Sequence, residues 1–270
     1  MLIDSHAHLD MEDFDADRTA VIRRAKDTGI DTIITVGIDL KSSLAALALS
    51  EANEGVYATV GIHPHNAEGW NENDLEHLAK LACNTRKVVA WGEIGLDFNR
   101  NYAPQEKQIS LFKAQLSVAR SLGLPVVIHD RDAHKTVLEI LKRYGGGDAG
   151  GVIHCFSGDI DLATSFIKLG YFISIPGTVT YKKAPTVKAV AALMPLERLI
   201  LETDAPFLSP VPFRGKRNEP SFVKYTALEV ARLKGISFER LADSTTQNTI
   251  NLFRIDSYKN HAHETERNNP

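Results

Sequence analysis

Short apolar runs recur along the chain, and longer amphipathic stretches separate them. Most of the runs are rich in valine and isoleucine and do not alternate apolar with polar positions. This pattern is typical of strands that are buried on both faces of a parallel sheet. We predict eight such strands, at residues 2–5, 31–36, 56–61, 88–91, 125–129, 151–154, 171–175 and 198–201.

The stretches between the runs predict helices, because apolar residues recur there at three- and four-residue steps, as at Ile109, Phe112 and Leu116. Glycines stand near the expected helix ends, where a left-handed residue is commonly needed: Gly29, Gly123, Gly170 and Gly235. Strands that alternate with helices indicate an α/β fold, a single (β/α)8 TIM barrel. An open doubly wound sheet is the alternative, and the lack of GxGxxG after the first strand weakens it.

Length and composition agree with one barrel domain. The chain has 270 residues, of which 43% are hydrophobic and 24% charged, and such barrels occupy about 250 residues. We assign the barrel to residues 1–255 and expect the polar segment 256–270 to be disordered, because it has almost no apolar residue to bury. No apolar run is long enough for a membrane span.

Cysteine usage and the amino-terminal residues predict a cytoplasmic protein. Cys83 and Cys155 are far apart and form no CxxC pair, which indicates neither a disulfide scaffold nor a thiolate zinc site. The first residues contain no basic segment followed by an apolar stretch, so we expect no secretory leader. We expect a monomer or a weak oligomer.

Histidines and carboxylates stand at the ends of the predicted strands. Six of them form the candidate metal-binding set: His6 and His8 after the first strand, Glu93 after the fourth, His129 and His154 ending the fifth and sixth, and Asp204 after the eighth. In a barrel the carboxyl ends of all strands meet at one rim, which carries the active site. Imidazole and carboxylate groups are ligands for divalent transition metals.

Six such groups at one rim are enough for two cations with one bridging carboxylate. His6 and His8 alternate by two along an extended chain, so both side chains point to the same side and can hold one cation. We expect Asp204 to join them, the histidines of the fifth and sixth strands to hold the second cation, and Glu93 to bridge the two. Histidine-rich ligation favours Zn²⁺ or Mn²⁺, although Mg²⁺ could be the working ion.

Lone histidines elsewhere have a simpler interpretation. A single histidine after a strand is more often a packing or loop residue than a ligand, and we interpret His65 and His77 in this way. His261 and His263 form another HxH pair, but in the polar tail, where we expect no metal role. The joint pattern around the rim, and not any single histidine, therefore indicates the metal centre.

The order of short motifs along the chain is the most specific feature of the sequence. The motifs are IDSHAHLD (3–10), VGIHPH (60–65), GEIGLDF (92–98), VVIHDRDA (126–133), VIHCFSG (152–158), LETDAPFLSP (201–210) and RNEP (217–220). In this order they resemble the motifs of the TatD family of metal-dependent deoxyribonucleases. The resemblance implies that the same six residues bind metal. Related barrels often carry a modified lysine on strand four, where Glu93 stands here, so no lysine modification is required.

This resemblance implies cleavage of DNA phosphodiester bonds, which we expect to be 3'-5' exonuclease action on single-stranded or frayed ends. Bound cations lower the pKa of a water molecule and neutralise charge on the substrate. We expect Asp204, Glu93 and His63 to be the catalytic residues, with Asp204 taking the proton of the attacking water. His63 contacts substrate or stabilises the leaving group; a hydrogen bond to a metal ligand is the alternative.

Arg131, Ser157, Lys182 and Arg217 are the candidate substrate contacts besides His63. Arg131 lies two residues beyond a predicted ligand and could bind a phosphate with its planar fork; a rim salt bridge is the alternative. Lys182 and Arg217 belong to basic loops after the seventh and eighth strands, and such residues are often only solvated. The net charge of −3 argues against coating of DNA by the overall field, but not against a local basic path.

Two other functions are compatible with the sequence. The same barrel and metals could hydrolyse a small cyclic amide, lactone or phosphoester, without need of the basic loops. A non-enzymatic interaction protein could keep the metals for stability. Glu202, beside Asp204, is expected to point into the barrel and orient His6 or His8.

Overall fold

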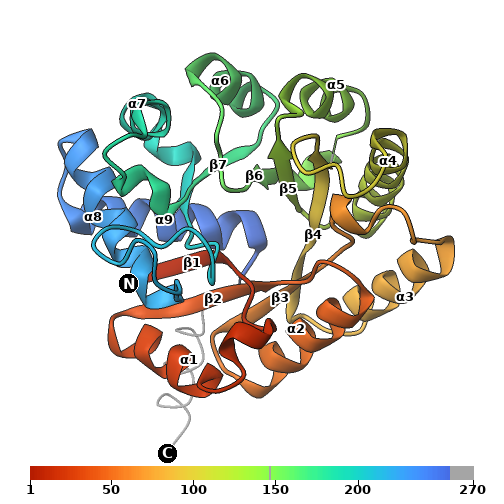
Figure 1. Cartoon of the computed structure of the whole chain (residues 1–270), viewed down its shortest axis with the longest axis horizontal. Helices are drawn as coiled ribbons and strands as arrows, with labels where there is room; N and C mark the ends of the chain where they lie inside the picture. Colours follow the sequence, from red (N-terminus) through yellow and green to blue (C-terminus); the bar gives the residue numbers. More distant parts are fainter. Residues whose placement is uncertain (146, 256–270) are drawn as a thin grey trace, which may run out of the picture.

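A parallel sheet forms the centre of the molecule. The computed structural model describes residues 1–145 and 147–255, and in this part of the chain eight strands follow one another around the sheet in sequence order. Their bounds are β1 Leu2–Ala7, β2 Ile30–Val36, β3 Val56–Val60, β4 Val88–Asp97, β5 Val126–Arg131, β6 Gly151–Ile153, β7 Phe172–Ile175 and β8 Leu199–Leu201. A parallel bridge from Ala7 to Ala205 joins β1 to the chain beyond β8. The sheet thereby closes into the predicted (β/α)8 barrel (Figure 1).

Helices surround this sheet and alternate with its strands (Figure 1). They are α1 Arg18–Asp27, α2 Leu40–Ala52, α3 Glu72–Cys83, α4 Gln105–Leu122, α5 His134–Tyr144, α6 Ile160–Lys168, α7 Pro185–Leu193, α8 Val223–Lys234 and α9 Phe238–Phe253. Gly123 and Gly235 cap α4 and α8 in the left-handed conformation, with φ of 65° and 66°. The glycine positions therefore predicted these helix ends correctly.

Three strands extend further than their apolar runs. β1 includes His6, β4 includes Glu93 and β5 includes His129, so the prediction that the first two of these residues follow their strands was wrong. The physical reason is that backbone pairing between parallel strands does not depend on side-chain polarity. Each strand continues for as long as the neighbouring strand offers backbone hydrogen-bond partners. Its last residues carry the polar side chains.

β4 continues through two glycines because it lies very close to β5. A Cβ atom at Gly92 would lie 2.6 Å from the Cβ of Val127, and one at Gly95 would run into the carbonyl of His129. Gly95 also has a φ of 141°, which side chains rarely allow. The glycines thus bring Glu93 and His129 together on adjacent strands.

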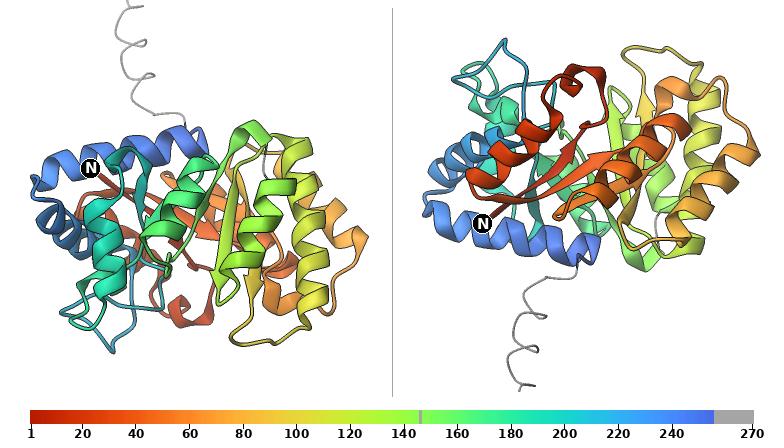
Figure 2. Two further views of the ribbon diagram at one scale, coloured as in Figure 1. Left: turned by 90° about the horizontal axis from the view of Figure 1, so that it is seen from above. Right: turned by 90° about the horizontal axis from the view of Figure 1, so that it is seen from below.

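The two ends of the barrel differ in polarity. Strand residues such as Ile34, Val127 and Ile200 form an apolar cluster with Leu252 and Phe253 from the end of α9. Figure 2 shows α9 lying across this end, opposite the long loop that follows β8. The candidate metal ligands occupy the other end.

In the part of the chain that the structure describes, no helix has the length and apolar character to cross a membrane. The predicted tail, residues 256–270, lies outside the described residues. Its predicted disorder and the division at residue 255 stay predictions.

Candidate metal centre

The structure brings all six predicted metal-binding residues together in one cluster, in which five are buried and His129 is partly buried. Glu93 lies at its centre. One carboxylate oxygen, Oε1, is 2.7 Å from Nδ1 of His129 and 2.9 Å from Nε2 of His154. The other oxygen, Oε2, is 3.5 Å from Nε2 of His6 and 3.8 Å from Nε2 of His8. The two oxygens of one carboxylate therefore face two separate pairs of imidazoles.

Asp204 stands on the side of the first pair. Its Oδ1 lies 3.5 Å from Nε2 of His8 and 3.8 Å from Nε2 of His6. The backbone N–H of Asp204 donates to the carbonyl of His6 at 2.9 Å, which ties the segment after β8 to β1. The Nε2 atoms of His6 and His8 are 3.3 Å apart, so this HxH pair points to one side as its spacing predicted.

Charge balance in the cluster is unusual for a buried site. Burial raises the pKa of Glu93, but His154, His63 and a hydrogen bond from His129 outweigh this effect and hold its pKa well below the usual value. Burial lowers the pKa of His154, but Glu93 and Glu202 raise it well above the usual value. Buried carboxylates need positive partners. A divalent cation would supply this positive charge, and the imidazoles would lose their protons to solvent when they bind it. The donor set therefore fits divalent metal ions.

Asp97 contacts the cluster and was not among the residues predicted from the sequence. It ends β4, is fully buried, and its Oδ2 lies 2.8 Å from Nε2 of His65 and 3.3 Å from Nε2 of His129. Its Oδ1 accepts the backbone N–H groups of Asn99 and Arg100. The strand period would have revealed it, because residues four apart on a strand share a face, and Asp97 follows Glu93 by four.

Glu202 forms its ion pair with a different histidine from the ones expected. Its Oε1 is 3.4 Å from Nδ1 of His154 and accepts the backbone N–H of Cys155 at 2.8 Å. The prediction that Glu202 orients His6 or His8 is therefore corrected to His154.

His63 lies at the edge of the cluster. Its Nε2 is 3.5 Å from Oε1 of Glu93, and its Nδ1 accepts the backbone N–H of His65 at 3.1 Å. His63, Glu93 and His129 also form a group that could hold a metal ion. His65 bonds to Asp97 instead of lying free in a loop, so it packs against the centre from outside.

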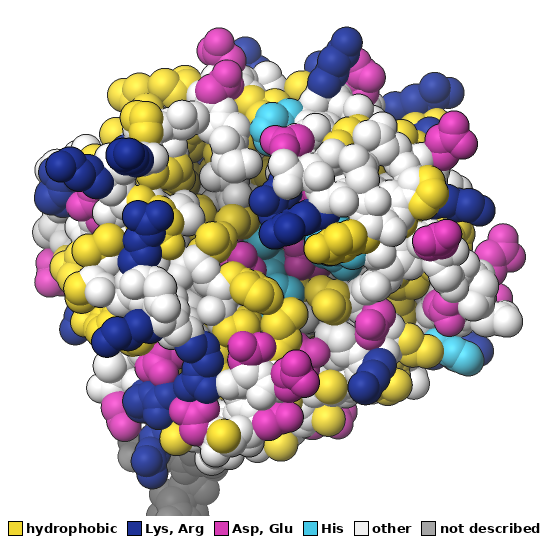
Figure 3. All heavy atoms as spheres, in the orientation of Figure 1, with side chains coloured by type: hydrophobic (Ala, Val, Ile, Leu, Met, Phe, Trp, Pro, Cys, Tyr) yellow, Lys and Arg dark blue, Asp and Glu magenta, His cyan; other side chains and the backbone are white. Residues whose placement is uncertain are grey.

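A pocket of about 440 Å³ opens beside His129 and His154. Of the candidate substrate contacts, Arg131 and Ser157 line this pocket. Lys183 lines it too, and its neighbour Lys182 is exposed. Figure 3 shows histidine side chains at the base of a hollow on this face, with lysine and arginine side chains at its edge. The basic groups therefore stand next to the cluster, as a path for an anionic substrate requires.

Arg217 has a different environment from the other candidate contacts. Its two terminal nitrogens lie 2.8 Å from the two carboxylate oxygens of Asp17, and Arg24 binds the same carboxylate at 3.1 Å. Arg24 also binds Glu219 at 2.6 Å. Arg217 thus joins the loop after β8 to the start of α1. This geometry does not favour the predicted contact between Arg217 and substrate.

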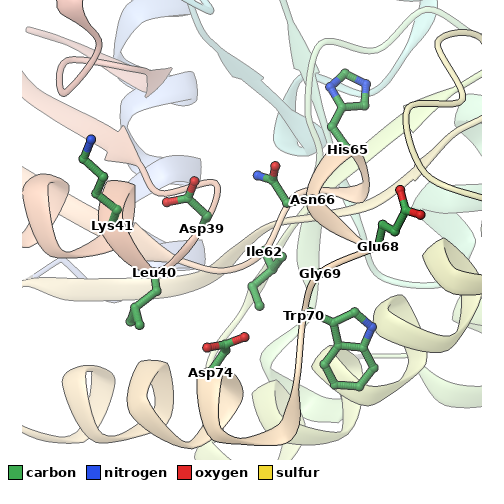
Figure 4. A pocket seen from close by; sticks show the side chains of 10 residues that line it. All are labelled: Asp39, Leu40, Lys41, Ile62, His65, Asn66, Glu68, Gly69, Trp70 and Asp74. Carbon is green, nitrogen blue, oxygen red and sulfur yellow. The ribbon is translucent and has the colours of Figure 1, made fainter.

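A second pocket of about 450 Å³ lies on the other side of His65 (Figure 4). Trp70 and three carboxylates line it, but two of these belong to helix ends. Asp39 accepts the backbone N–H of Ser42 at the start of α2, and Asp74 forms a capping box at the start of α3. These carboxylates therefore have a structural role.

Comparison with known proteins agrees with this site. The chain matches the family described as TatD related DNase over residues 3–254. The chain belongs to this family. An uncharacterized metal-dependent hydrolase of Bacillus subtilis is 43% identical over 256 residues, which are 95% of this chain and 100% of that protein. A protein of Pantoea vagans named 3'-5' ssDNA/RNA exonuclease TatD is 37% identical over 260 residues, covering 94% and 100% of the two chains.

Solved structures of TatD relatives have the same architecture. A TatD homologue from Escherichia coli K12 superposes with a TM-score of 0.89 at 36% identity, covering 94% of this chain and 98% of the other. This TatD-related chain is therefore a metal-dependent hydrolase on a (β/α)8 barrel, as the motifs predicted. Its buried histidine–glutamate cluster could hold metal.

Proposed function

We propose that this TatD-related protein is a 3'-5' exonuclease that hydrolyses phosphodiester bonds in single-stranded DNA or at frayed DNA ends, with two divalent cations at the candidate metal centre. The observation that carries the proposal is the position of Glu93, whose two oxygens face two separate pairs of imidazoles. The names of relatives at 36–37% identity, 3'-5' ssDNA/RNA exonuclease, support nucleic acid as the substrate.

Two ligand sets would share Glu93 as a bridge: His6, His8 and Asp204 in the first, and His129 and His154 in the second. Divalent ions held there supply Lewis-acid activation of water and neutralise charge on the phosphate. The imidazole-rich set favours Zn²⁺ or Mn²⁺ as the bound ions, with Mg²⁺ as a working ion.

Asp204 is proposed to accept a proton from the attacking water. Burial raises its pKa, but the hydrogen bond from His8 and the charges of His154 and His6 lower it below its usual value. Asp204 is therefore a carboxylate at neutral pH. It is open enough to meet a water molecule, since it lines the pocket beside the cluster.

His63 is proposed to donate a hydrogen bond to a substrate oxygen. Burial lowers its pKa to about 4, so the imidazole is neutral at physiological pH. Because Nδ1 accepts the N–H of His65, the single ring proton sits on Nε2. That atom is on the side of Glu93, where the scissile phosphate would lie.

Arg131, Ser157 and the adjacent lysines Lys182 and Lys183 are proposed to hold the phosphates of the strand. An arginine fork matches phosphate oxygens in pairs, and backbone charge is the main source of affinity for nucleic acid. A pocket of this size admits a strand end more readily than the middle of a duplex. The cytoplasmic location and the monomeric or weakly oligomeric state stay predictions.

Degradation of 5'-labelled single-stranded DNA by the purified protein tests the proposal. With Mn²⁺ we expect stepwise shortening from the 3' end, and none after chelation. Asp204→Asn should abolish turnover and keep the fold, whereas Asp161→Asn, at an exposed position of α6, should change neither. A metal-loaded protein that leaves DNA intact but hydrolyses a lactone, a cyclic amide or a small phosphoester would overturn the nuclease assignment.

A further inference from the structure

Two exposed aromatic side chains stand beside the candidate metal centre, on loops that follow opposite strands. Phe207 is on the loop after β8 and is 48% exposed, and Tyr102 is on the loop between β4 and α4 and is 62% exposed. Because the eight strands follow one another in order around the barrel, β4 and β8 lie across it from each other. The two rings therefore flank the mouth.

Each ring contacts a histidine of the centre or its surroundings. The ring centroids of Phe207 and His8 are 6.1 Å apart at 68°, and those of Tyr102 and His65 are 4.7 Å apart at 70°. Both contacts are edge-to-face. No stacked partner is found for either ring among the described residues, so each can still receive a flat partner.

The backbone of Phe207 is held firmly although its ring is exposed. Its N–H donates to the carbonyl of Asp204 at 2.8 Å, and its carbonyl accepts from Nδ2 of Asn218 at 2.6 Å. The buried side chain of Asn218 also donates to the carbonyl of Thr203. A phenylalanine ring presented on a fixed backbone beside a reactive centre suits recognition of a ligand, because little ordering is needed on binding.

We propose that Phe207 and Tyr102 stack against the bases of the nucleotides that flank the phosphate at the metal centre. This inference rests on the proposed nuclease function. The side chains around the centre agree with this proposal. Arg131 and Lys183 line the pocket beside the centre and suit phosphates, while the two aromatic rings suit bases. Stacking tolerates any sequence, because every base has a π face.

The same arrangement selects single strands. A base inside a duplex is already stacked on its neighbours and paired, so it cannot place a face against a side chain without being unstacked. A base at a frayed end or in a single strand is free to do so. Phe207 and Tyr102 thus determine specificity for strand type and not for sequence.

Alanine substitutions test the stacking role of Phe207 and Tyr102. Phe207→Ala and Tyr102→Ala are each expected to lower kcat/KM on single-stranded DNA by about 5- to 150-fold, the usual effect of removing one stacked ring. Phe207→Trp should retain activity, and Phe207→Leu, which keeps apolar bulk without a π face, should behave like alanine. Leu193→Ala is the matched control, because Leu193 is an exposed apolar residue on α7 away from the mouth.

An oligonucleotide of abasic units separates stacking from other roles. Wild type and Phe207→Ala should cleave it at the same rate and contain the same amount of metal. An equal loss on abasic and normal strands, or a loss of metal, would show that the ring supports His8 and would overturn the stacking proposal. If wild type cleaves DNA and both alanine variants cleave it at the same rate, the stacking proposal is overturned and the nuclease function stands. A wild type that cleaves no DNA would overturn the nuclease function as well.

Discussion

Replacement of Asp97 by asparagine tests whether a buried carboxylate outside the ligand set controls the metal centre. Oδ1 of Asp97 accepts two backbone N–H groups, from Asn99 and Arg100. An asparagine would keep its oxygen there and turn its NH₂ group toward His129 and His65. Nε2 of His129 would then have to accept a hydrogen bond, and its ring proton would move to Nδ1, the atom that faces Glu93.

The expected loss follows from this change of tautomer. A protonated Nδ1 has no lone pair for a cation, so one of the two histidine ligands of the second ion is impaired. Loss of a group that orients a metal-bound histidine weakens metal affinity by about 10- to 100-fold, or about 1.4–2.7 kcal/mol. The ion on the His6 and His8 side should bind as before, because neither residue contacts Asp97 within hydrogen-bond distance.

Competition with a coloured chelator measures the affinity of each ion in turn. Asp130→Asn is the matched control, because Asp130 is the neighbour of His129 on β5 and also pairs with a histidine, with Oδ2 2.9 Å from Nδ1 of His134. We expect one weakened ion in Asp97→Asn and none in the control. Two ions bound as tightly in Asp97→Asn as in wild type would refute the reasoning.

Three further predictions concern the bridge, the acid stability and the loop after β8. Glu93→Gln should reduce bound metal from two ions to at most one, because an amide offers one acceptor oxygen; two ions found by elemental analysis would contradict the bridge. Hydrogen bonds from two arginines lower the pKa of Asp17 to about 2, so its ionised form stabilises the fold above about pH 4, and this stability is lost as the pH falls from about 4 to 2. Between pH 4 and 2 the melting temperature of wild type should fall more steeply with pH than that of Asp17→Asn. Equal slopes would show that Asp17 contributes nothing to acid stability. Asn218→Ala removes two hydrogen bonds to backbone carbonyls beside Asp204 and should destabilise the protein by about 2–4 kcal/mol; a shift in urea unfolding equivalent to less than 1 kcal/mol would contradict this role.

The apolar runs predicted the barrel but not the full strands. Valine- and isoleucine-rich segments indicate where a strand is buried on both faces, and all eight predicted runs coincide with strands. They end where polar side chains begin, so the last part of β4, from Gly92 to Asp97, was not predicted. Asp97 lies in this unpredicted part of β4, so the two-residue period that relates it to Glu93 was not applied to it.

The sequence by itself determined which chemical groups meet. Strand order and the two-residue period place imidazoles and carboxylates at one rim, because these rules depend only on local backbone geometry. Only the tertiary structure decided which atoms face one another: that the two oxygens of Glu93 face two separate pairs of histidines, that Glu202 lies beside His154, and that Arg217 binds Asp17. These pairings depend on the stagger of neighbouring strands and on side-chain rotamers. Both are set by packing between residues far apart in the chain, and no local pattern encodes them.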